Sequence, residues 1–425
     1  MKIPTAIKNA IKENNLVVFA GAGVTKNIGL PEWRDLAVEI INYLNNNNEY
    51  ENLINRLRTG ENPINIFNSL EKEHKVEIKQ YISKNFNLSN SNSFQVQKSI
   101  LKLTSQIITT NYDTAFESAY IQMYDEKFPN IAIQNLDRLN LMEIVRSNEF
   151  LFKLHGCATH PESCAIFSSD YTKIYKKDSP TLFLLKSLAM QKKILFVGFS
   201  FNDITLRKIF YNQARMFDGC LKHFILTPSP QIFKDCNFLT PIKLNYGEIT
   251  NAFTELANFK EPIIEKKNTE VINQLKETLA NSPLFEDVTS DGIASIASNS
   301  NIYTLSKEDY LCRSGDEVRS FWFIWNGDIA AKKNGITTTI RTTGDIVGEL
   351  GLLEKRSKRS SDLIANKHKT RVVEIELSVI HELIPKNQMN IWRNLASILG
   401  DKIEKQDFMI CEIKQLMYKY RNDSK

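Results

Sequence analysis

The sequence predicts an α/β protein in two parts, a doubly wound parallel sheet followed by an antiparallel β-roll with flanking helices. Two observations favour this fold class. Apolar runs of strand length alternate with longer amphipathic segments over roughly the first 250 residues, which is typical of a parallel sheet covered by helices. From about residue 300 onward, short strand-like runs are separated by Asn-Gly and other glycine turns, which is typical of antiparallel structure.

Five apolar runs in the first half have the length of buried strands. They are residues 16–20, 107–110, 150–154, 194–198 and 223–226. Amphipathic segments between them, such as 33–44 and 181–191, predict helices. We therefore expect a Rossmann-like doubly wound sheet in the first part of the chain.

In the second half, residues 265–280 have the composition of a charged helix. Two short runs, 321–325 and 329–332, each end near an Asn-Gly pair, so we expect them to be strands of a roll. Apolar residues recur at near-helical spacing over 390–420, which predicts one or two terminal helices. The resulting domains are 1–260, a linker helix at 261–283, the β-roll at 284–389 and a helical segment at 390–425.

The composition excludes several classes of protein. Hydrophobic residues make up 42% and charged residues 24% of the 425 residues, so the chain can bury a core and is not a disordered protein. The net charge of +5 is too small to indicate a nucleic-acid partner. No apolar run reaches the roughly 18 residues of a membrane helix, and no secretory signal is visible. We therefore expect a cytoplasmic protein with reduced cysteines and no membrane partner.

A glycine pair directly follows the first predicted strand. Gly21 and Gly23 allow a phosphate to approach the backbone closely, and a helix beginning behind them would present N–H groups to it. Lys26 stands where a dinucleotide-binding fingerprint has its third glycine. The pair on its own is therefore equally compatible with a tight turn.

Polar residues follow three further predicted strands. Asn111 and Asp113 follow the second strand, His155 the third, and Ser200 and Asp203 the fourth. Ligands of open parallel sheets bind beyond the carboxyl ends of the strands. We therefore expect these side chains to converge on one cleft.

The order and spacing of these motifs over residues 16–207 resemble those of the sirtuins, and more closely the sirtuin-like domains of bacterial anti-phage effectors. The resemblance implies a sirtuin- or Rossmann-like fold that takes NAD+ as its substrate, with the glycine loop at the pyrophosphate. It implies a catalytic role for Asn111 and for His155 as the general base. The other residues that it assigns to NAD+ binding are Gly21, Ala22, Gly23, Thr25, Trp33, Arg34, Asp113, Gly198, Ser200 and Asp203.

The sequence departs from protein-deacylating sirtuins in one respect. Those enzymes carry a zinc module of two CxxC pairs soon after the histidine, whereas no CxxC lies between His155 and Gly198. The spacing of Cys157, His160 and Cys164 matches no usual zinc site, so we expect no metal. The departure favours simple cleavage of NAD+, through an oxocarbenium-like state as in glycosidases, over deacylation of a peptide.

A second motif lies in the C-terminal half. Gly348 and Glu349 open a short apolar segment whose N–H groups can bind a phosphate. Glu349 can accept a hydrogen bond from a ribose hydroxyl, and Arg359 can return to the phosphate as a bidentate donor. The alternative is a solvated basic loop, because the same stretch is rich in Lys and Arg.

Residues 282 to about 383 resemble cyclic-nucleotide-binding domains, from the Ser-Pro-Leu-Phe start to the Gly-Glu-Leu…Arg-Ser-Ser cassette. The resemblance implies a cyclic nucleotide as effector and a C-terminal helix that moves over it. Gly351 and a slightly long loop depart from the usual cassette and leave the base preference open. The residues implied in nucleotide binding are Gly348, Glu349, Leu350, Arg359, Ser360 and Ser361.

The two resemblances together indicate effectors of bacterial cyclic-nucleotide defence systems such as Pycsar. We therefore expect a cyclic-nucleotide-activated NAD+ hydrolase that releases nicotinamide and ADP-ribose, depletes NAD+ during phage infection and forms a homo-oligomer. The alternatives are a nucleotide-regulated NAD-dependent protein deacylase and a transcription factor of catabolite-activator type. The transcription factor is disfavoured, because the roughly forty residues after the roll are too few for a usual winged helix-turn-helix.

Overall fold

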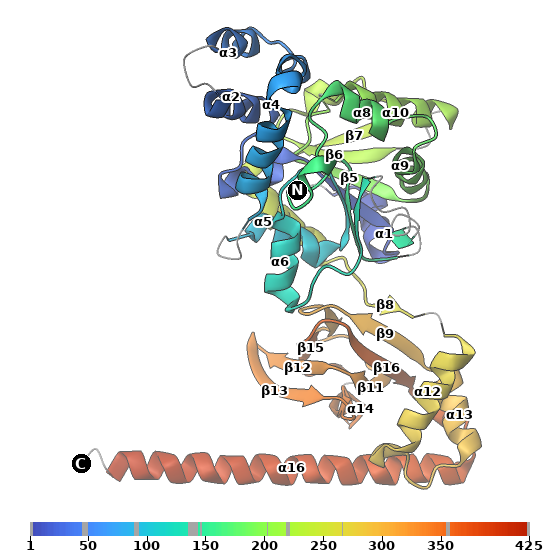
Figure 1. Cartoon of the computed structure of the whole chain (residues 1–425). Coiled ribbons are helices and arrows are strands. Elements are labelled where there is room, and N and C mark those ends of the chain that lie inside the picture. Colours follow the sequence, from blue (N-terminus) through green and yellow to red (C-terminus); the bar gives the residue numbers. More distant parts are fainter. Residues whose placement is uncertain are drawn as a thin grey trace. The chain divides into compact units, whose positions relative to one another are not determined.

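The computed structural model describes residues 3–44, 50–88, 93–134, 143–144, 147–201, 203–217, 222–265, 267–353 and 358–422. The chain divides into two compact units, Met1–Glu261 and Pro262–Lys425, which are described separately (Figure 1). Within the ranges just given, none of the helices combines the length and the hydrophobicity needed to span a bilayer.

A seven-stranded parallel sheet forms the centre of the first unit, with strand order β3-β4-β2-β1-β5-β6-β7. The five predicted strands are confirmed as β1 (Leu16–Ala20), β2 (Gln106–Thr109), β4 (Phe150–Lys153), β5 (Lys193–Val197) and β6 (His223–Thr227). Two edge strands, β3 (Ile131–Ile133) and β7 (Leu239–Lys243), were not predicted. β3 has only three residues, and β7 contains Pro241, which interrupts the apolar pattern and is tolerated mainly at a sheet edge.

Helices cover both faces of this sheet, as the doubly wound fold class requires. Alternate residues of β1 enter different cores: Val18 packs in one buried cluster and Phe19 in the other. The first face is covered by α1 (Thr5–Lys12), α5 (Gln95–Leu103), α6 (Ala115–Tyr124) and α11 (Ile249–Ala257). The second face is covered by α9 (Pro180–Gln191) and α10 (Ile204–Met216).

Three helices near the N-terminus build a separate buried cluster. They are α2 (Trp33–Leu44), α3 (Glu51–Arg58) and the 24-residue α4 (Pro63–Phe86). The predicted helix at 33–44 is therefore confirmed as α2. The same cluster includes Tyr112 and Phe167, so these helices pack on the segments that follow β2 and β4.

The second unit is built on two antiparallel sheets, which confirms the predicted roll. One has the strand order β10-β15-β12-β13 and the other β14-β11-β16-β9-β8. The strands are β8 (Ile263–Ile264), β9 (Asn301–Leu305), β10 (Tyr310–Cys312), β11 (Ser320–Asn326), β12 (Asp328–Lys333), β13 (Ile336–Thr342), β14 (Ile346–Val347), β15 (Asp362–Ala365) and β16 (Thr370–Glu376). The helices are α12 (Thr269–Ala280), α13 (Ser290–Asn299), α14 (Leu350–Leu353), α15 (Leu377–His381) and α16 (Pro385–Asn422).

The two Asn-Gly pairs of the roll have different roles. Asn334 and Gly335 both have positive φ, 53° and 79°, and join the neighbouring strands β12 and β13, as expected for a tight hairpin turn. The pair at Asn326 and Gly327 instead carries the chain from β11 in one sheet to β12 in the other.

The helical segments of this unit begin at different residues from those predicted. α12 begins at Thr269 rather than 265, because Glu265 follows β8 and pairs with Arg371 at 2.7 Å. Its Leu275 is fully buried in the core of the second unit, although the sequence assigned this stretch to a linker. The terminal segment is one continuous helix, α16, which begins at residue 385 instead of 390.

Candidate functional site

Four neighbouring strands of the first unit direct their carboxyl ends to one edge of the sheet. β4, β2, β1 and β5 are adjacent in that order and all parallel. The segments that follow them carry the glycine loop, Asn111, His155 and Asp203. The predicted site residues are thus brought to the place where ligands bind in open parallel sheets.

The glycine loop after β1 is bonded directly to the end of β5. The N–H of Gly21 donates to the carbonyl of Val197 at 3.0 Å, and the N–H of Gly23 donates to the carbonyl of Gly198 at 2.9 Å. A Cβ on Gly23 would lie 2.7 Å from the Cα of Gly198, whose own φ is +60°. These glycines are therefore required for the contact between the two loops, whatever ligand they meet.

The helix expected directly behind the glycine pair is not formed. Two short 3₁₀ turns, η1 (Ala22–Val24) and η2 (Lys26–Ile28), follow instead, and α2 begins only at Trp33. The N–H groups of Val24 and Thr25 donate to carbonyls within the loop. The expectation that a helix N-terminus presents N–H groups to a phosphate here is therefore wrong.

Of three further residues predicted to bind NAD+, Trp33 lies beside the segment after β2, whereas Arg34 and Ser200 are exposed. The ring of Trp33 lies 6.3 Å from that of Tyr112, beside the segment after β2. Arg34 is exposed, and its guanidinium donates to the carbonyl of Leu57. Ser200 is also exposed.

Asn111 and Asp113 lie on the segment after β2. The amide of Asn111 donates to the carbonyl of Gly21 at 3.3 Å, which connects this segment to the glycine loop. Asp113 is buried and accepts from the N–H of Ala115 at 3.0 Å. Burial raises the pKa of the Asp113 carboxyl to about 6, and the nearby Lys153 ammonium opposes that shift.

A fully buried lysine, which sequence reasoning missed, supports this segment. The ammonium of Lys153, the last residue of β4, donates to the carbonyl of Asp113 and to the carboxylate of Glu117 at 2.8 Å. Burial alone lowers the pKa of Lys153, but the carboxylate of Glu117 outweighs it and the pKa is raised. A lysine inside an otherwise apolar predicted strand was the available signal, because buried lysines are rare unless paired.

His155 follows β4 and is buried, with 6% of its surface exposed. Its Nε2 lies 2.6 Å from the hydroxyl of Tyr175 and 3.6 Å from Oδ2 of Asp203. Burial lowers the pKa of His155 to about 4, and the Asp203 carboxylate opposes that shift. The imidazole is therefore neutral near pH 7, as a general base must be.

Asp203 reaches His155 from the far side of the site. Its Oδ1 accepts from the N–H groups of Thr205 and Leu206 at 2.8 and 3.0 Å, which caps the N-terminus of α10. The sequence assigned Asp203 to NAD+ binding. Its position next to the His155 ring is an additional feature that strand-end motifs alone did not predict.

Two tyrosines that the sequence analysis did not select also lie at His155. Tyr171 belongs to α8 (Ser168–Ile174), and Tyr175 directly follows this helix. The rings of Tyr171 and His155 are 5.1 Å apart. The four-residue spacing of the tyrosines was the available signal, since residues four apart share one helix face.

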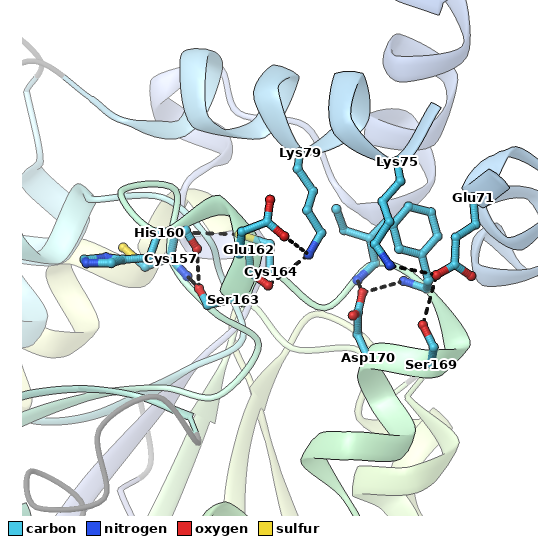
Figure 2. Close-up of polar contacts among 12 residues, drawn as sticks. Glu71, Lys75, Lys79, Cys157, His160, Glu162, Ser163, Cys164, Ser169 and Asp170 are labelled. Carbon is cyan, nitrogen blue, oxygen red and sulfur yellow. Dashed lines mark hydrogen bonds and ion pairs between the residues drawn. The ribbon is translucent and has the colours of Figure 1, made fainter. Parts of the chain in front are cut away.

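Side chains of α4 anchor the segment that lies between His155 and these tyrosines (Figure 2). The buried Lys79 donates to the carbonyl of Glu162 at 2.9 Å. Glu71 accepts from Lys75 at 3.0 Å and from the hydroxyl of Ser169 at 3.1 Å. These contacts fix both the loop after His155 and the start of α8.

The cysteines near His155 do not form a metal cluster in the described part of the chain. The thiol of Cys164 donates to the carbonyl of Cys157 at 3.4 Å, and burial raises the pKa of Cys164 to about 12. His160 is exposed and contacts Thr159. Among the described residues no three His, Cys, Asp or Glu side chains are grouped so as to hold a metal ion.

The second predicted site, in the C-terminal unit, is built around Arg359. Its guanidinium lies 4.0 Å over the ring of Trp322, donates to the carbonyl of Gly348 at 2.9 Å and reaches Ser320 at 3.4 Å. Burial lowers the pKa of Arg359. Arg359 is only 6% exposed, and its Nε has no hydrogen-bond partner among the described residues. A buried, incompletely satisfied guanidinium is suited to an anionic ligand.

Gly348 and Glu349 of the cassette lie beside this arginine. Gly348 has φ +82°, and a Cβ there would lie 2.7 Å from the ring of Trp322. Glu349 is buried and accepts from the ammonium of Lys402 at 2.7 Å. Lys402 belongs to α16, so the acid expected to bind a ribose hydroxyl is paired with the terminal helix instead.

The remaining cassette residues frame the same region. Leu350 begins α14 and is half exposed, while Ser360 and Ser361 are half-buried and directly precede β15. Most of the basic loop between α14 and Arg359, residues 354–357, lies outside the described residues.

The two units match two known domain families. Residues 105–246 match the SIR2-like domain, and residues 303–387 match the cyclic nucleotide-binding domain. The chain thus joins a SIR2-like domain to a C-terminal cyclic nucleotide-binding domain, which confirms the two resemblances. The first match begins after the glycine loop, so the place of that loop in the site comes from the sheet topology.

Curated relatives match parts of the chain. The NAD(+) hydrolase ThsA of Bacillus cereus (strain MSX-D12) is 27% identical over 205 residues, which are 46% of this chain and 39% of that protein. The corresponding enzyme of Acinetobacter baumannii (strain 532279) is 24% identical over 218 residues, 47% and 39% of the two chains. The Pycsar effector protein XpPycTIR of Xanthomonas perforans is 26% identical over 98 residues, 23% and 31% of the two chains. The chain thus spans well under half the length of each relative.

Proposed function

We propose that this protein is an NAD+ glycohydrolase controlled by a cyclic nucleotide. The observation that carries the proposal is the buried, neutral imidazole of His155 at the same sheet edge as Asn111 and the glycine loop. The similarity to two NAD(+) hydrolases supports the choice of substrate. The products are nicotinamide and ADP-ribose.

The chemistry requires few groups. The bond between C1′ of the ribose and the pyridinium nitrogen breaks, and its electron pair leaves with neutral nicotinamide. A water oxygen bonds to C1′ of the resulting oxocarbenium-like centre. The water loses a proton to His155, while the amide of Asn111 orients the water or the ribose 2′-hydroxyl. Because the leaving group is already cationic, no strong nucleophile is needed.

The C-terminal unit supplies the control. Arg359, with its unpartnered Nε, binds the cyclic phosphate, and Glu349 accepts from the ribose hydroxyl. The hydroxyl meets a carboxylate whose Oε1 already accepts from Lys402 of α16, so binding acts on a group that contacts this helix. Shifting a two-state protein from 1% to 99% active requires about 5.5 kcal/mol of differential affinity.

The biological role within this proposal is depletion of NAD+ in defence against phage. The similarity to a Pycsar effector protein supports it. Assembly into a homo-oligomer, which would let several bound nucleotides contribute to one switch, also stays a prediction. Light scattering with and without nucleotide measures it.

The proposal is tested by measuring NAD+ consumption against a panel of cyclic mono- and oligonucleotides. We expect one nucleotide class to start turnover, His155→Ala to remain inactive, and Arg359→Lys to need far more nucleotide because the guanidinium fork is lost. A parallel reaction with an acetylated peptide distinguishes a deacylase. Product formed only when peptide is present, or no NAD+ loss with any nucleotide, would overturn the proposal.

A further inference from the structure

Two side chains from different elements converge on one atom of the candidate active site. Nε2 of His155 lies 2.6 Å from the hydroxyl of Tyr175 and 3.6 Å from Oδ2 of Asp203. Among the described residues, the titratable groups in contact with the ring are these two and Tyr171. Asp203 comes from the segment after β5, whereas the two tyrosines come from α8 and the residue that follows it, which the strand-end motifs do not place at the histidine.

We infer that Tyr175 and Asp203 are positioning residues for NAD+ cleavage, acting on opposite protonation states of His155. Tyr175 fixes the orientation of the neutral ring, and Asp203 stabilises the imidazolium that forms when the ring takes a proton. The inference rests on the proposed NAD+ glycohydrolase activity and names how the base of that same site is prepared.

The hydroxyl of Tyr175 determines which nitrogen of His155 is basic. Burial raises the pKa of the Tyr175 phenol, so the hydroxyl keeps its proton. We take this hydroxyl as the donor to Nε2 at 2.6 Å. In a neutral imidazole one nitrogen accepts and the other carries the proton. With the hydroxyl as donor, Nε2 is the acceptor and Nδ1 carries the ring proton before substrate binds.

The carboxylate of Asp203 is oriented by the helix it caps. Oδ1 accepts two N–H groups at the start of α10, whereas the buried Oδ2 has no hydrogen-bond partner in the described part of the chain. Oδ2 therefore lies 3.6 Å from Nε2 of His155 without a hydrogen-bond donor of its own among the described residues, and its charge also acts on the phenols of Tyr171 and Tyr175. A negative charge held at this distance favours the imidazolium over the neutral ring.

The segment that carries Tyr175 is itself held in place. Asp170 on α8 accepts from the N–H groups of Ile166 and Phe167 at 3.2 Å, and Ser169 donates to Glu71 of α4 at 3.1 Å (Figure 2). The tyrosine thus directly follows a helix whose start is held by these hydrogen bonds. Such bracing is what a group that orients a base requires.

The test compares three variants of the full chain in the presence of the activating nucleotide. Tyr175→Phe removes only the hydroxyl at Nε2. Asp203→Asn removes the charge but keeps Oδ1 as the cap of α10. Tyr81→Phe is the matched control, because its hydroxyl donates to Glu39 at 3.2 Å at an exposed site.

We expect Tyr175→Phe to lower kcat at least tenfold with KM for NAD+ changed less than threefold, and Tyr81→Phe to leave both unchanged. Asp203→Asn should also lower kcat. It should move the acid limb of the pH–rate profile to lower pH by about one unit, because the charge that raises the pKa of His155 is gone. Nitrogen-15 NMR of labelled histidine should show the Nδ1–H tautomer in the wild type and a mixture in Tyr175→Phe.

The outcomes separate the two proposals. If the wild type consumes NAD+ but Tyr175→Phe and Asp203→Asn match the Tyr81→Phe control, the positioning roles are wrong. If no nucleotide elicits NAD+ loss, the proposed function fails, while the NMR spectra still test the contact at Nε2. An Nε2–H tautomer in the wild type would overturn the role of Tyr175 by itself.

Discussion

The carboxyl of Asp113 makes stability depend on pH. Burial raises its pKa from 3.8 to about 6, so folding favours the protonated form. That stabilisation is fully present below about pH 4 and is lost as the pH rises through 6, where the charged carboxylate has to be buried. A shift of this size corresponds to about 3 kcal/mol.

Asp113→Asn should therefore be more stable than the wild type at pH 8 by about 1–3 kcal/mol, and no more stable at pH 4. Urea unfolding at the two pH values measures the difference. The exposed Asp178 provides the control, since Asp178→Asn should change stability little at either pH. An equal gain for Asp113→Asn at both pH values would contradict the explanation.

A single methyl group at Gly198 should destabilise the first unit. It has φ +60°, and a Cβ would lie 2.6 Å from the N of Val24 and 2.8 Å from the C of Gly23. Both are backbone atoms, so the clash cannot be relieved by rotating a side chain. Gly198→Ala should lower the melting temperature by roughly 5 °C or more.

Gly247 is the matched control for that change. A Cβ there would meet no atom within 4 Å, and its φ is not positive. Gly247→Ala should leave the melting temperature of the full chain within about 2 °C. A similar loss in both variants would show that the contact between the two loops is not the cause.

Secondary-structure elements could be predicted where they are fully buried, because full burial gives an unbroken apolar run in the sequence. β1 and β5 are central, apolar strands, and their runs were identified closely. β3, with three residues, and β7, with Pro241, lie at edges where burial imposes a weaker pattern. α16 was placed by its apolar spacing, but that spacing does not mark its first residue, Pro385.

The candidate site was predictable to the extent that it follows strand ends. Asn111 and His155 directly follow β2 and β4, so parallel topology alone brings them to one edge. Tyr175 lies 20 residues after His155 in the sequence, and it contacts the histidine only because of the way α8 packs. Lys402 is more than fifty residues from Glu349, and no local motif marks the pair.

Under the proposed control by a cyclic nucleotide, the ion pair between Lys402 of α16 and Glu349 should oppose effector binding. Lys402 donates to Glu349 at 2.7 Å and to the carbonyl of Ile346 at 3.0 Å. Lys402→Met removes both contacts and frees the carboxylate for a ribose hydroxyl. We expect the nucleotide to bind at least fivefold more tightly, measured by calorimetry, and the free protein to melt at a lower temperature because a buried carboxylate loses its partner.

The same helix offers a control for this variant. Arg393 on α16 forms an exposed ion pair with Asp287 at 2.9 Å, a type that contributes little to stability. Arg393→Met should alter neither the affinity nor the melting temperature appreciably. Weaker nucleotide binding in Lys402→Met would show that the lysine supports the ligand rather than competing with it.

At the scale of the whole molecule, each unit has its own buried core. Val18 and Phe19 lie in cores of the first unit, and Phe321 lies in a core of the second. We therefore expect two calorimetric unfolding transitions. A cyclic nucleotide at a hundred times its Kd contributes about 2.7 kcal/mol and should raise only the transition of the second unit, by roughly 5–10 °C.

The glycine variant assigns the two transitions. Gly198→Ala should lower the transition that the nucleotide does not raise, because Gly198 belongs to the first unit. One transition that responds both to the nucleotide and to Gly198→Ala would mean that the two cores unfold together. In that case the units would not be thermodynamically separate.

The hydrogen bonds from Gly21 and Gly23 to Val197 and Gly198 also limit how this protein can be re-engineered. A graft that exchanges residues 21–25 alone must keep glycine at 21 and 23, because a Cβ at either position would lie within 3 Å of the unchanged backbone at Gly198. The smallest transplantable piece therefore comprises both segments, although 172 positions separate residue 25 from residue 197. Libraries that aim to change the ligand of the proposed site should randomise the two stretches jointly.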